Sequence, residues 1–255
     1  MKISIVTSTY NSEKTVRDTL GSIYNQSYKN VELIIIDGNS KDKTLEIIRH
    51  YEKLFQGRLR YISEPDKGIY DAMNKGIRMA TGDIIGILNS DDLYMDENVL
   101  IDIHDTFANN NVDAIYGNLI FVDEYDTNKV VRTWKGSQYL SGSFLKGWHP
   151  AHPTFYVKRE MYEKYGVFDI SFDVSADFEL MLRFIEKFKI SNLYMDRTLV
   201  KMRMGGESTG SIKKIITGNK NVLRAFKKNG FDVSVFYPVK RLLPKAINII
   251  KNKFK

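Results

Sequence analysis

The chain has 255 residues, of which 43% are hydrophobic and 27% are charged. These fractions are close to the averages of soluble globular proteins and exclude collagen-like, coiled-coil and disordered classes. No run of about 18 apolar residues occurs, so we expect no transmembrane helix. The absence of cysteine excludes disulfides, thiolate zinc sites and cysteine nucleophiles. The first residues lack the pattern of a signal peptide, and we expect a cytoplasmic protein.

The charge is distributed unevenly along the chain. The formal net charge is +7, but residues 212–255 alone carry +11, which leaves −4 for residues 1–211. A strongly basic tail beside a mildly acidic body points to an anionic partner surface. We therefore expect a folded domain over residues 1–211 and a basic helical tail over residues 212–255.

The first 120 residues alternate strand and helix patterns. Residues 31–36 form a continuous apolar run, which is typical of a parallel strand buried on both faces. Strands are predicted at residues 3–6, 31–36, 59–63, 83–88 and 114–116, and helices at residues 13–24, 69–80 and 96–109, with a further helix capped by Ser40 or Asp42. This repetition implies right-handed crossovers and a mainly parallel, doubly wound α/β sheet.

After Gly117 the pattern becomes mixed. Residues 119–122 and 129–134 flank a polar turn and predict a hairpin. Later helices are predicted at residues 159–165 and 176–188, short strands at 190–194 and 199–202, and loops at 136–147 and 204–211. No linker or internal repeat separates the two halves, so we expect one continuous α/β domain with a mixed second half.

Polar side chains gather where the first four predicted strands end. In open α/β sheets, ligands bind in the crevice beyond the carboxyl ends of the strands. One such polar end could be ordinary turn chemistry, but four together predict a ligand site. The four segments are residues 7–11 (TSTYN), 37–38 (DG), 64–68 (EPDKG) and 89–92 (NSDD).

Two adjacent carboxylates, Asp91 and Asp92, follow a buried strand. Without compensation they repel each other, and each raises the pKa of the other. A hard divalent cation would remove this repulsion and could bridge the carboxylates to diphosphate oxygens. The alternative is that one of them only caps the following helix.

Three common motifs are missing from this sequence. There is no G-x-G-x-x-G after the first strand, no G-x-x-x-x-G-K-[ST] and no G-x-S-x-G. Their absence argues against a dinucleotide-binding dehydrogenase, a P-loop NTPase and an α/β-hydrolase. A sugar-nucleotide site remains as the explanation for an acidic pair at a strand end.

Several segments resemble the inverting glycosyltransferases of family two, which have the GT-A fold. The resemblance covers about residues 1–205 and rests on residues 7–11, 37–44 and 89–92. Residues 63–76 (SEPDKGIYDAMNKG) more specifically resemble a bacterial subgroup that builds exopolysaccharide, colanic-acid-type and lipopolysaccharide glycans. The resemblance implies a metal-dependent enzyme that moves a sugar from a nucleotide-sugar donor to a glycan or a polyprenyl-diphosphate-linked acceptor.

The resemblance assigns three residues to the nucleoside part of the donor. Asp37 matches the carboxylate that accepts a hydrogen bond from the nucleotide base. Ser8 and Tyr10 match positions beside the base and the ribose, and Tyr10 would offer a stacking face. The resemblance therefore predicts that the first two strand ends hold the nucleoside.

Three further residues are assigned to the rest of the donor. Lys67 falls where the family often places a cation near the diphosphate, and Asp91 matches a residue that contacts the ribose. Asp92 matches the ligand of the metal ion, which would be Mn²⁺ or Mg²⁺. The sequence departs from the commoner Asp-x-Asp form at Asn89, which supplies no charge.

A second acidic segment carries the predicted general base. The family has a Glu-Asp pair at the start of a helix here; in this chain Ala176 replaces the Glu and Asp177 remains. The helix dipole helps an Asp near a helix start to stay ionised, as a proton acceptor must be. A plain helix cap is the alternative reading, and Glu179 is the second candidate for the base.

Three residues just after the predicted loop at 136–147 each allow a functional and a structural interpretation. His152 could reach the diphosphate or the metal, or it could make only structural hydrogen bonds. Whether His149 joins the metal site is equally open. Trp148 could form a platform for a sugar ring or could pack in the interior.

The end of the chain predicts a membrane-surface helix. Apolar residues recur at helical spacing over residues 239–254, with lysines and arginines around them. Such a basic amphipathic helix is typical of the membrane interface, which would place the protein on the inner face of the cell membrane. A helix packed on the domain is the alternative, and nucleic acid is not expected because no recognition motif occurs.

Two other functions stay open at this level. A nucleotidyltransferase that makes sugar nucleotides would share the fold, although such enzymes usually carry a Gly-rich basic loop after the first strand. A non-catalytic sugar-nucleotide binder would share the donor site but lack transfer activity.

Overall fold

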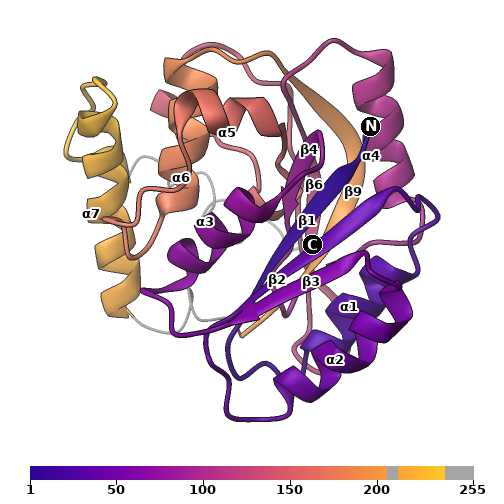
Figure 1. The fold of residues 1–255 in the computed structure, drawn as a ribbon. Helices are drawn as coiled ribbons and strands as arrows, with labels where there is room; N and C mark the ends of the chain where they lie inside the picture. Colours follow the sequence, from indigo (N-terminus) through magenta and orange to yellow (C-terminus); the bar gives the residue numbers. More distant parts are fainter. Residues whose placement is uncertain (206–211, 239–255) are drawn as a thin grey trace.

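The computed structural model describes residues 1–205 and 212–238, and within them nine strands form one sheet (Figure 1). The strands are β1 (Ile3–Thr9), β2 (Val31–Asp37), β3 (Leu59–Ser63), β4 (Ile84–Ile87), β5 (Leu93–Tyr94), β6 (Ala114–Val122), β7 (Val130–Trp134), β8 (Tyr156–Lys158) and β9 (Asn192–Arg203). The helices are α1 (Val16–Tyr24), α2 (Thr44–Phe55), α3 (Ile69–Met79), α4 (Val99–Asn109), α5 (Arg159–Tyr165), α6 (Ala176–Met181) and α7 (Ile212–Lys228). Two 3₁₀ turns, η1 (Phe144–Lys146) and η2 (His152–Thr154), precede β8, and the π-helical η3 (Leu182–Lys187) continues α6.

The sheet has a parallel half and a mixed half. Strands β3, β2, β1 and β4 lie side by side in this order and run parallel. Beyond β4, the antiparallel β8 leads to β6, which pairs parallel to β9 and antiparallel to β7, and β5 pairs antiparallel to β9. The prediction of a GT-A type α/β fold with a mixed second half is confirmed.

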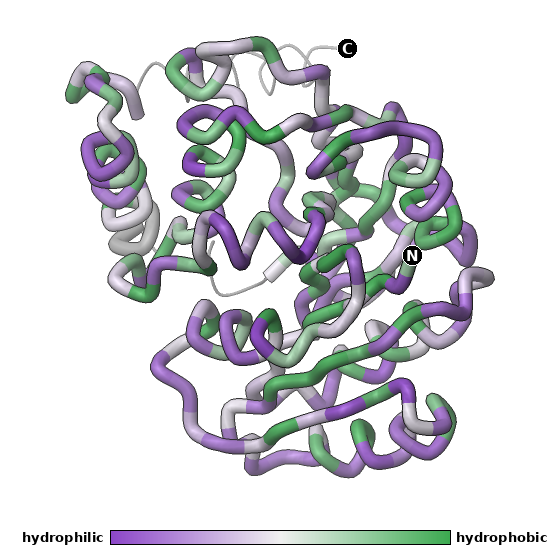
Figure 2. The backbone as a smooth tube through the Cα atoms, turned by 45° about the horizontal axis from the view of Figure 1, so that its top comes forward, coloured by the Kyte–Doolittle hydropathy of each residue, from purple (hydrophilic) through white to green (hydrophobic). Residues whose placement is uncertain are grey.

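Hydrophobic clusters cover both faces of the sheet. Along β2, Leu33 and Ile35 pack with α1, α2 and α4, whereas Ile34 and Ile36 pack with α3, α5, α6 and α7. Figure 2 accordingly shows green along the central strands and alternating green and purple along the helices. This burial on both faces explains why the sequence of β2 is continuously apolar.

Several predicted boundaries were wrong. The separate strands expected at residues 114–116 and 119–122 are one strand, β6, and those at 190–194 and 199–202 are one strand, β9. The pairing of β6 with β9 continues through a register shift near Gly117 instead of ending there. A Cβ on Gly117 would lie 2.8 Å from the carbonyl oxygen of Arg197, so glycine permits this close approach. The two- and three-residue strands β5 and β8 carry too little pattern to be predicted.

Residues 212–238 pack against the rest of the fold. Val222, Ala225 and Phe226 of α7 are buried in the same cluster as α6, and Asn221 donates a hydrogen bond to the Asp173 carboxylate at 2.9 Å. The predicted membrane-surface helix at residues 239–255 lies outside the described residues. Every helix within residues 1–205 and 212–238 is too short or too polar to span a bilayer.

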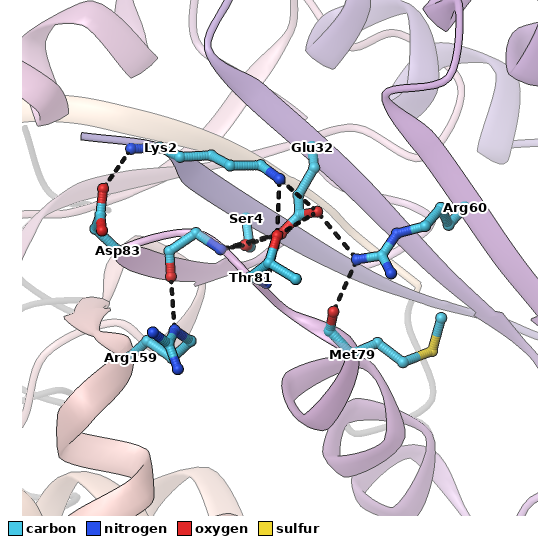
Figure 3. Close-up of polar contacts among 9 residues, drawn as sticks. Lys2, Ser4, Glu32, Arg60, Met79, Thr81, Asp83 and Arg159 are labelled. Carbon is cyan, nitrogen blue, oxygen red and sulfur yellow. Dashed lines mark hydrogen bonds and ion pairs between the residues drawn. The ribbon is translucent and has the colours of Figure 1, made fainter.

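A buried carboxylate joins the amino ends of the four parallel strands (Figure 3). Glu32 of β2 accepts hydrogen bonds from Ser4 Oγ of β1 at 2.6 Å and from Arg60 Nη2 of β3 at 3.0 Å. Lys2 Nζ, just before β1, and the Thr81 backbone N–H, just before β4, donate to it at 2.9 and 2.7 Å. Burial alone would raise the pKa of Glu32, but the hydrogen bonds from Ser4, Lys2 and Thr81 outweigh it and lower the pKa to about 2.

We expect Glu32→Gln to lower the free energy of unfolding at pH 7 by about 2 kcal/mol, because the amide cannot accept all of these bonds. The folded-state pKa lies below the ordinary value of 4.5. The carboxylate therefore stabilises the fold above pH 4.5, and its contribution is lost as the pH falls toward 2. Urea unfolding of both proteins across this range checks the prediction, with the exposed Glu52→Gln as control. Equal stability of wild type and Glu32→Gln at pH 7 would contradict it.

Candidate functional site

The carboxyl ends of the parallel strands form one continuous surface. Ser12, after β1, and Ser90, after β4, have their hydroxyl oxygens 2.9 Å apart. The backbone N–H of Asn11 donates to Ser40 Oγ, after β2, at 2.8 Å. The polar segments that were predicted to form a ligand site are therefore brought together by the sheet.

An aromatic ring and a carboxylate meet over Gly38. A Cβ added to Gly38 would lie 3.3 Å from Tyr10 Cδ2 and 3.4 Å from Asp66 Oδ2. Tyr10 is 65% exposed, whereas the side chain of Asp66 is largely buried and receives a hydrogen bond on Oδ1 from Lys75 at 2.6 Å. From the sequence, no role was predicted for Asp66, although this residue lies in the polar segment at residues 64–68.

Asp37 lies beneath this surface and is fully buried. Its carboxylate accepts hydrogen bonds from Thr9 Oγ1 at 3.0 Å, from Ser63 Oγ at 2.7 Å and from both the backbone N–H and the hydroxyl of Ser40. These bonds join β1, β2 and β3 at their carboxyl ends. The predicted contact between Asp37 and a nucleotide base stays a prediction, and it would require one of these bonds to open.

The predicted cation on the loop before α3 is exposed. Lys67 uses its backbone N–H to bond Asp71 Oδ2 at 3.1 Å. The ion pairs of this loop are made instead by Lys75, whose Nζ lies 2.6 Å from both Glu64 Oε1 and Asp66 Oδ1. Lys75 therefore holds the loop, and the side chain of Lys67 projects from it.

The acidic pair lies at the end of β4. Asp91 is half-buried, Asp92 is fully buried, and Asn89 Nδ2 donates to Asp92 Oδ2 at 3.2 Å. Burial raises the pKa of both carboxyls, and the charge of Asp91 raises that of Asp92 further. The nearby guanidinium of Arg203 opposes both increases. The guanidinium of Arg203 compensates the charge of only one of the two carboxylates. The remaining negative charge favours binding of a further cation.

Arg203, at the end of β9, was not predicted. It is nearly buried and donates to the carbonyl oxygens of Asp91 and Glu124 at 3.4 and 2.8 Å and to Asp18 Oδ2 at 2.7 Å. It thereby joins the acidic loop to α1 and to the end of β6. No local pattern marks this residue, because its partners are up to 185 residues away in sequence.

Four buried oxygens at the ends of β1 and β4 have no hydrogen-bond partner among the described residues. They are Thr7 Oγ1, Ser8 Oγ, Asn89 Oδ1 and Asp92 Oδ1. Leaving a buried polar atom unpaired costs about 1–3 kcal/mol, so such groups call for a specific explanation. Oxygen atoms of this kind are the ligands that Mg²⁺ and related hard cations prefer.

The side chains at the carboxyl ends of β1 and β4 would supply only some of the ligands of a metal ion. Within residues 1–205 and 212–238, no cluster of three or more His, Asp or Glu side chains could hold a metal ion. The acidic pair fits a cation that takes its remaining ligands from a bound diphosphate, as Mg²⁺ usually does. Ligation of a metal by Asp92 stays a prediction.

Asp177 lies at the start of α6 and is half-buried. Its Oδ1 accepts a hydrogen bond from the Tyr70 hydroxyl at 3.1 Å. Ser175, two residues earlier, is the N-cap residue of α6 and has a φ of 69°. The carboxylate thus stands at a helix N-terminus, as predicted, and Tyr70 is a partner that the sequence did not reveal.

The second candidate, Glu179, faces the interior instead. Its side chain is 1% exposed and is held by the guanidinium of Arg183 at 3.1 Å and by Asn229 Nδ2 at 3.0 Å. Arg183 also donates to the carbonyl oxygens of Tyr165, Gly166 and Val167. Glu179 therefore connects α6 to α7 and to the end of α5.

The two histidines near this helix differ in their surroundings. Burial lowers the pKa of His152, and the charge of Asp177 acts in the opposite direction. His149 Nδ1 lies 2.9 Å from the carbonyl oxygen of Pro150, and its ring meets those of Trp134 and Phe178 edge-on. His152 is thus the histidine near the predicted base, and metal ligation by either stays a prediction.

Trp148 packs in a cluster of rings. Its centroid lies 5.7 Å from those of Tyr116 and Phe144 and 5.8 Å from that of Tyr139. It is partly buried against the cluster that contains α6. Packing therefore accounts for Trp148, and a role as a sugar platform stays a prediction.

Comparison with known proteins identifies the family. Residues 4–173 match the family described as glycosyl transferase family 2. The chain belongs to this family. The match includes every strand end described above, from β1 to β4, and stops four residues before Asp177.

Curated relatives of this family 2 glycosyltransferase extend beyond the matched region. An uncharacterized glycosyltransferase of Haemophilus influenzae is 30% identical over 237 residues, which cover 92% of each chain. A PGL/p-HBAD biosynthesis glycosyltransferase of Mycobacterium bovis is 28% identical over 193 residues, covering 75% of this chain and 73% of the relative.

Solved glycosyltransferases share the fold. TarS 1–349 of S. aureus, in complex with UDP-GlcNAc, superimposes with a TM-score of 0.68 at 16% identity, over 93% of this chain and 69% of that one. The mannosyltransferase PcManGT of Pyrobaculum calidifontis, in complex with GDP-Man and Mn²⁺, gives 0.66 at 20% identity, over 95% and 69%. The chain spans 41% of a longer TarS chain.

The contacts of Glu179 predict a structural role for this residue in the glycosyltransferase. We expect Glu179→Gln to lower the free energy of unfolding by about 2 kcal/mol, because the ion pair of the buried Glu179 carboxylate with Arg183 is lost. Chemical denaturation measures this change, with Glu163→Gln on the exposed face of α5 as control. An unchanged stability would contradict the structural role and would return Glu179 to the list of candidates for catalysis.

Proposed function

We propose that the protein is a metal-dependent, inverting glycosyltransferase that moves a sugar from a nucleotide-sugar donor to an acceptor hydroxyl. The observation that carries the proposal is the group of unpaired buried oxygens beside the acidic pair, at the ends of β1 and β4. Two neighbours in fold support it, because one structure is a complex with UDP-GlcNAc and the other a complex with GDP-Man and Mn²⁺. These groups would receive a donor diphosphate and its cation.

The nucleoside would lie over Gly38. Tyr10 is exposed enough to stack on a base, and stacking on an aromatic ring tolerates any base. Asp66 Oδ2 lies at the same place and could accept a hydrogen bond from a base N–H, while Asp37 fixes the strand ends beneath. Ser8, next to this position on β1, has a hydroxyl available for the ribose or the diphosphate.

The diphosphate would lie at the acidic pair, with Lys67 projecting from the loop before α3. A divalent cation bound by Asp91 and Asp92 would neutralise the leaving diphosphate. Asp91 is the more accessible carboxylate, whereas Asp92 has an unpaired oxygen and the more strongly raised pKa. Arg203 holds the acidic loop in place through its backbone.

Asp177 would act as the general base. The acceptor oxygen forms a bond to the anomeric carbon, and the bond from that carbon to the diphosphate oxygen breaks, with the electron pair leaving on the diphosphate. The acceptor proton passes to Asp177, which lies at the start of α6. Glu179 is unsuited to this role because Arg183 and Asn229 occupy it.

The acceptor is proposed from the resemblance of residues 63–76 to enzymes of bacterial surface glycans. It would be a glycan or a polyprenyl-diphosphate-linked sugar, handled at an anionic membrane surface. The Mycobacterium bovis relative is likewise a glycosyltransferase of a biosynthetic route, that of PGL/p-HBAD. The stretch at 239–255 that would contact the membrane lies outside the described residues.

We expect both Asp91→Asn and Asp92→Asn to abolish the increase in melting temperature that Mn²⁺ with UDP or GDP gives the wild type, because the cation loses a charged ligand. Without metal, Asp92→Asn should melt higher than the wild type, since it removes a desolvated charge. Differential scanning fluorimetry measures both effects. Asp96→Asn, which changes an exposed carboxylate between β5 and α4, is the control and should respond like the wild type. A full Mn²⁺-dependent increase in both variants would rule out the acidic pair as the metal site.

We expect Asp177→Asn to lower turnover by about two orders of magnitude or more, the usual range for loss of a general base. Donor affinity should hardly change, because Asp177 does not contact the nucleotide in the proposed arrangement. The measurement is release of nucleoside diphosphate from UDP-GlcNAc and GDP-Man. Near wild-type turnover of Asp177→Asn would show that the base is another group.

The same assay separates the two rival functions. A glycosyltransferase releases a nucleoside diphosphate and passes on the sugar. A nucleotidyltransferase would instead release pyrophosphate from a nucleoside triphosphate in the presence of a sugar phosphate. A non-catalytic binder would show nucleotide-dependent stabilisation without any release.

A further inference from the structure

One tyrosine on α3 reaches the start of α6. Tyr70 lies in the first turn of α3, and its hydroxyl donates to Asp177 Oδ1 at 3.1 Å across 107 residues of sequence. Among the described residues, no hydrogen bond is found to Oδ2 of Asp177. Within the described residues, Oδ1 is therefore the carboxylate oxygen that the protein holds.

The position of Tyr70 is fixed by a buried amide. Asn74, one turn further along α3, is 2% exposed and makes two hydrogen bonds to the backbone of Phe168: Nδ2 donates to the carbonyl oxygen at 2.8 Å, and Oδ1 accepts from the N–H at 2.9 Å. The ring of Phe168 lies 5.5 Å from that of Tyr70. This packing leaves the Tyr70 hydroxyl little freedom to move away from Asp177.

His152 completes the surroundings of the carboxylate. Its ring contacts Phe168 edge-on at 5.6 Å, so Tyr70 and His152 both pack against the same ring. Burial raises the pKa of Tyr70, and the charge of Asp177 raises it further, so the hydroxyl stays protonated and can donate. Burial lowers the pKa of His152, which favours the neutral ring at neutral pH.

We propose that Tyr70 is a positioning residue for the general base: its hydroxyl bond to Oδ1 orients Asp177 and leaves Oδ2 to take the acceptor proton. The proposal rests on the proposed function for the catalytic role of Asp177. A hydrogen bond to the charged form of a carboxyl favours that form, so the pH dependence of the reaction reports on this bond.

Among the described residues, two titratable side chains from other elements act on Asp177: Tyr70 of α3 through its hydrogen bond, and His152 of η2 through a charge interaction. Glu179 of α6 and Arg183 pair with each other in the interior, so together they add no net charge. From α7, Gly218 approaches Ser175 and brings no charge. Loss of the Tyr70 hydroxyl is therefore the change that should move the titration of Asp177 most directly.

The test uses Tyr70→Phe in the full chain, since phenylalanine keeps the ring packed on Phe168 and removes only the hydroxyl. Tyr51→Phe is the matched control, because the Tyr51 hydroxyl donates to the carbonyl oxygen of Arg17, away from α6. The probe is hydrolysis of UDP-GlcNAc or GDP-Man with water as acceptor. We expect kcat to fall about tenfold, KM for the donor to stay unchanged, and the acidic limb of the kcat profile to move to higher pH.

A second measurement does not depend on activity. Titration of ¹³C-labelled Asp carboxyls by NMR, with the Asp177 signal assigned from Asp177→Asn, should show a higher pKa for Asp177 in Tyr70→Phe than in the wild type and in Tyr51→Phe. An unchanged pKa of Asp177, or a fall in kcat without movement of the acidic limb, would overturn the positioning role. Absence of nucleoside diphosphate release by the wild type would contradict the proposed function alone, because the titration would still decide the role of Tyr70.

Discussion

The bonding of the buried Glu32 carboxylate is the constraint on which the site depends. It joins β1, β2 and β3 and the segments just before β1 and β4 at their amino ends, so four parallel strands have one relative alignment. A slip of one residue in any of them would turn its side chains to the opposite face of the sheet. Because the alignment is fixed at that end, the loops at the carboxyl ends can carry unpaired polar groups without loss of register.

The carboxyl ends contrast with the amino ends in how their polar groups are satisfied. Asp37 resembles Glu32, since every oxygen of its buried carboxylate is bonded and it joins three strands. Asp92 is equally buried but keeps one oxygen unpaired and lies beside a like charge. A buried group that the fold leaves unsatisfied costs stability, and proteins retain such groups where a ligand completes them. This difference is the physical reason to propose the acidic pair as a ligand site, whereas the contact of Asp37 with a nucleotide base stays a prediction.

The sequence predicted the parts of the molecule that depend on local pattern. The continuous apolar run of β2 and the alternation with helices were enough to predict the parallel half, and the carboxyl ends of such strands must converge. The burial of individual polar side chains could not be predicted from such local patterns. Asp37 and Asp66 both follow strands, but only the structure shows that one is enclosed and the other lies over Gly38. Arg203 and Tyr70 act across 100 residues or more, and no spacing reveals such contacts.

Helix α3 connects the two chemical tasks of the proposed site. The loop before it carries Asp66, which lies over Gly38, and Lys67, which we propose to lie near the donor diphosphate; its first turn carries Tyr70 to Asp177. The loop enters the helix at Gly68, whose φ of 111° is strained for any residue with a side chain. Asn74 then fixes the helix to the segment before α6. Because α3 contacts both parts of the proposed site, a shift of the loop before α3 would be transmitted to Asp177. In the proposed function, α3 would therefore couple donor binding to proton acceptance without movement of one half of the sheet against the other.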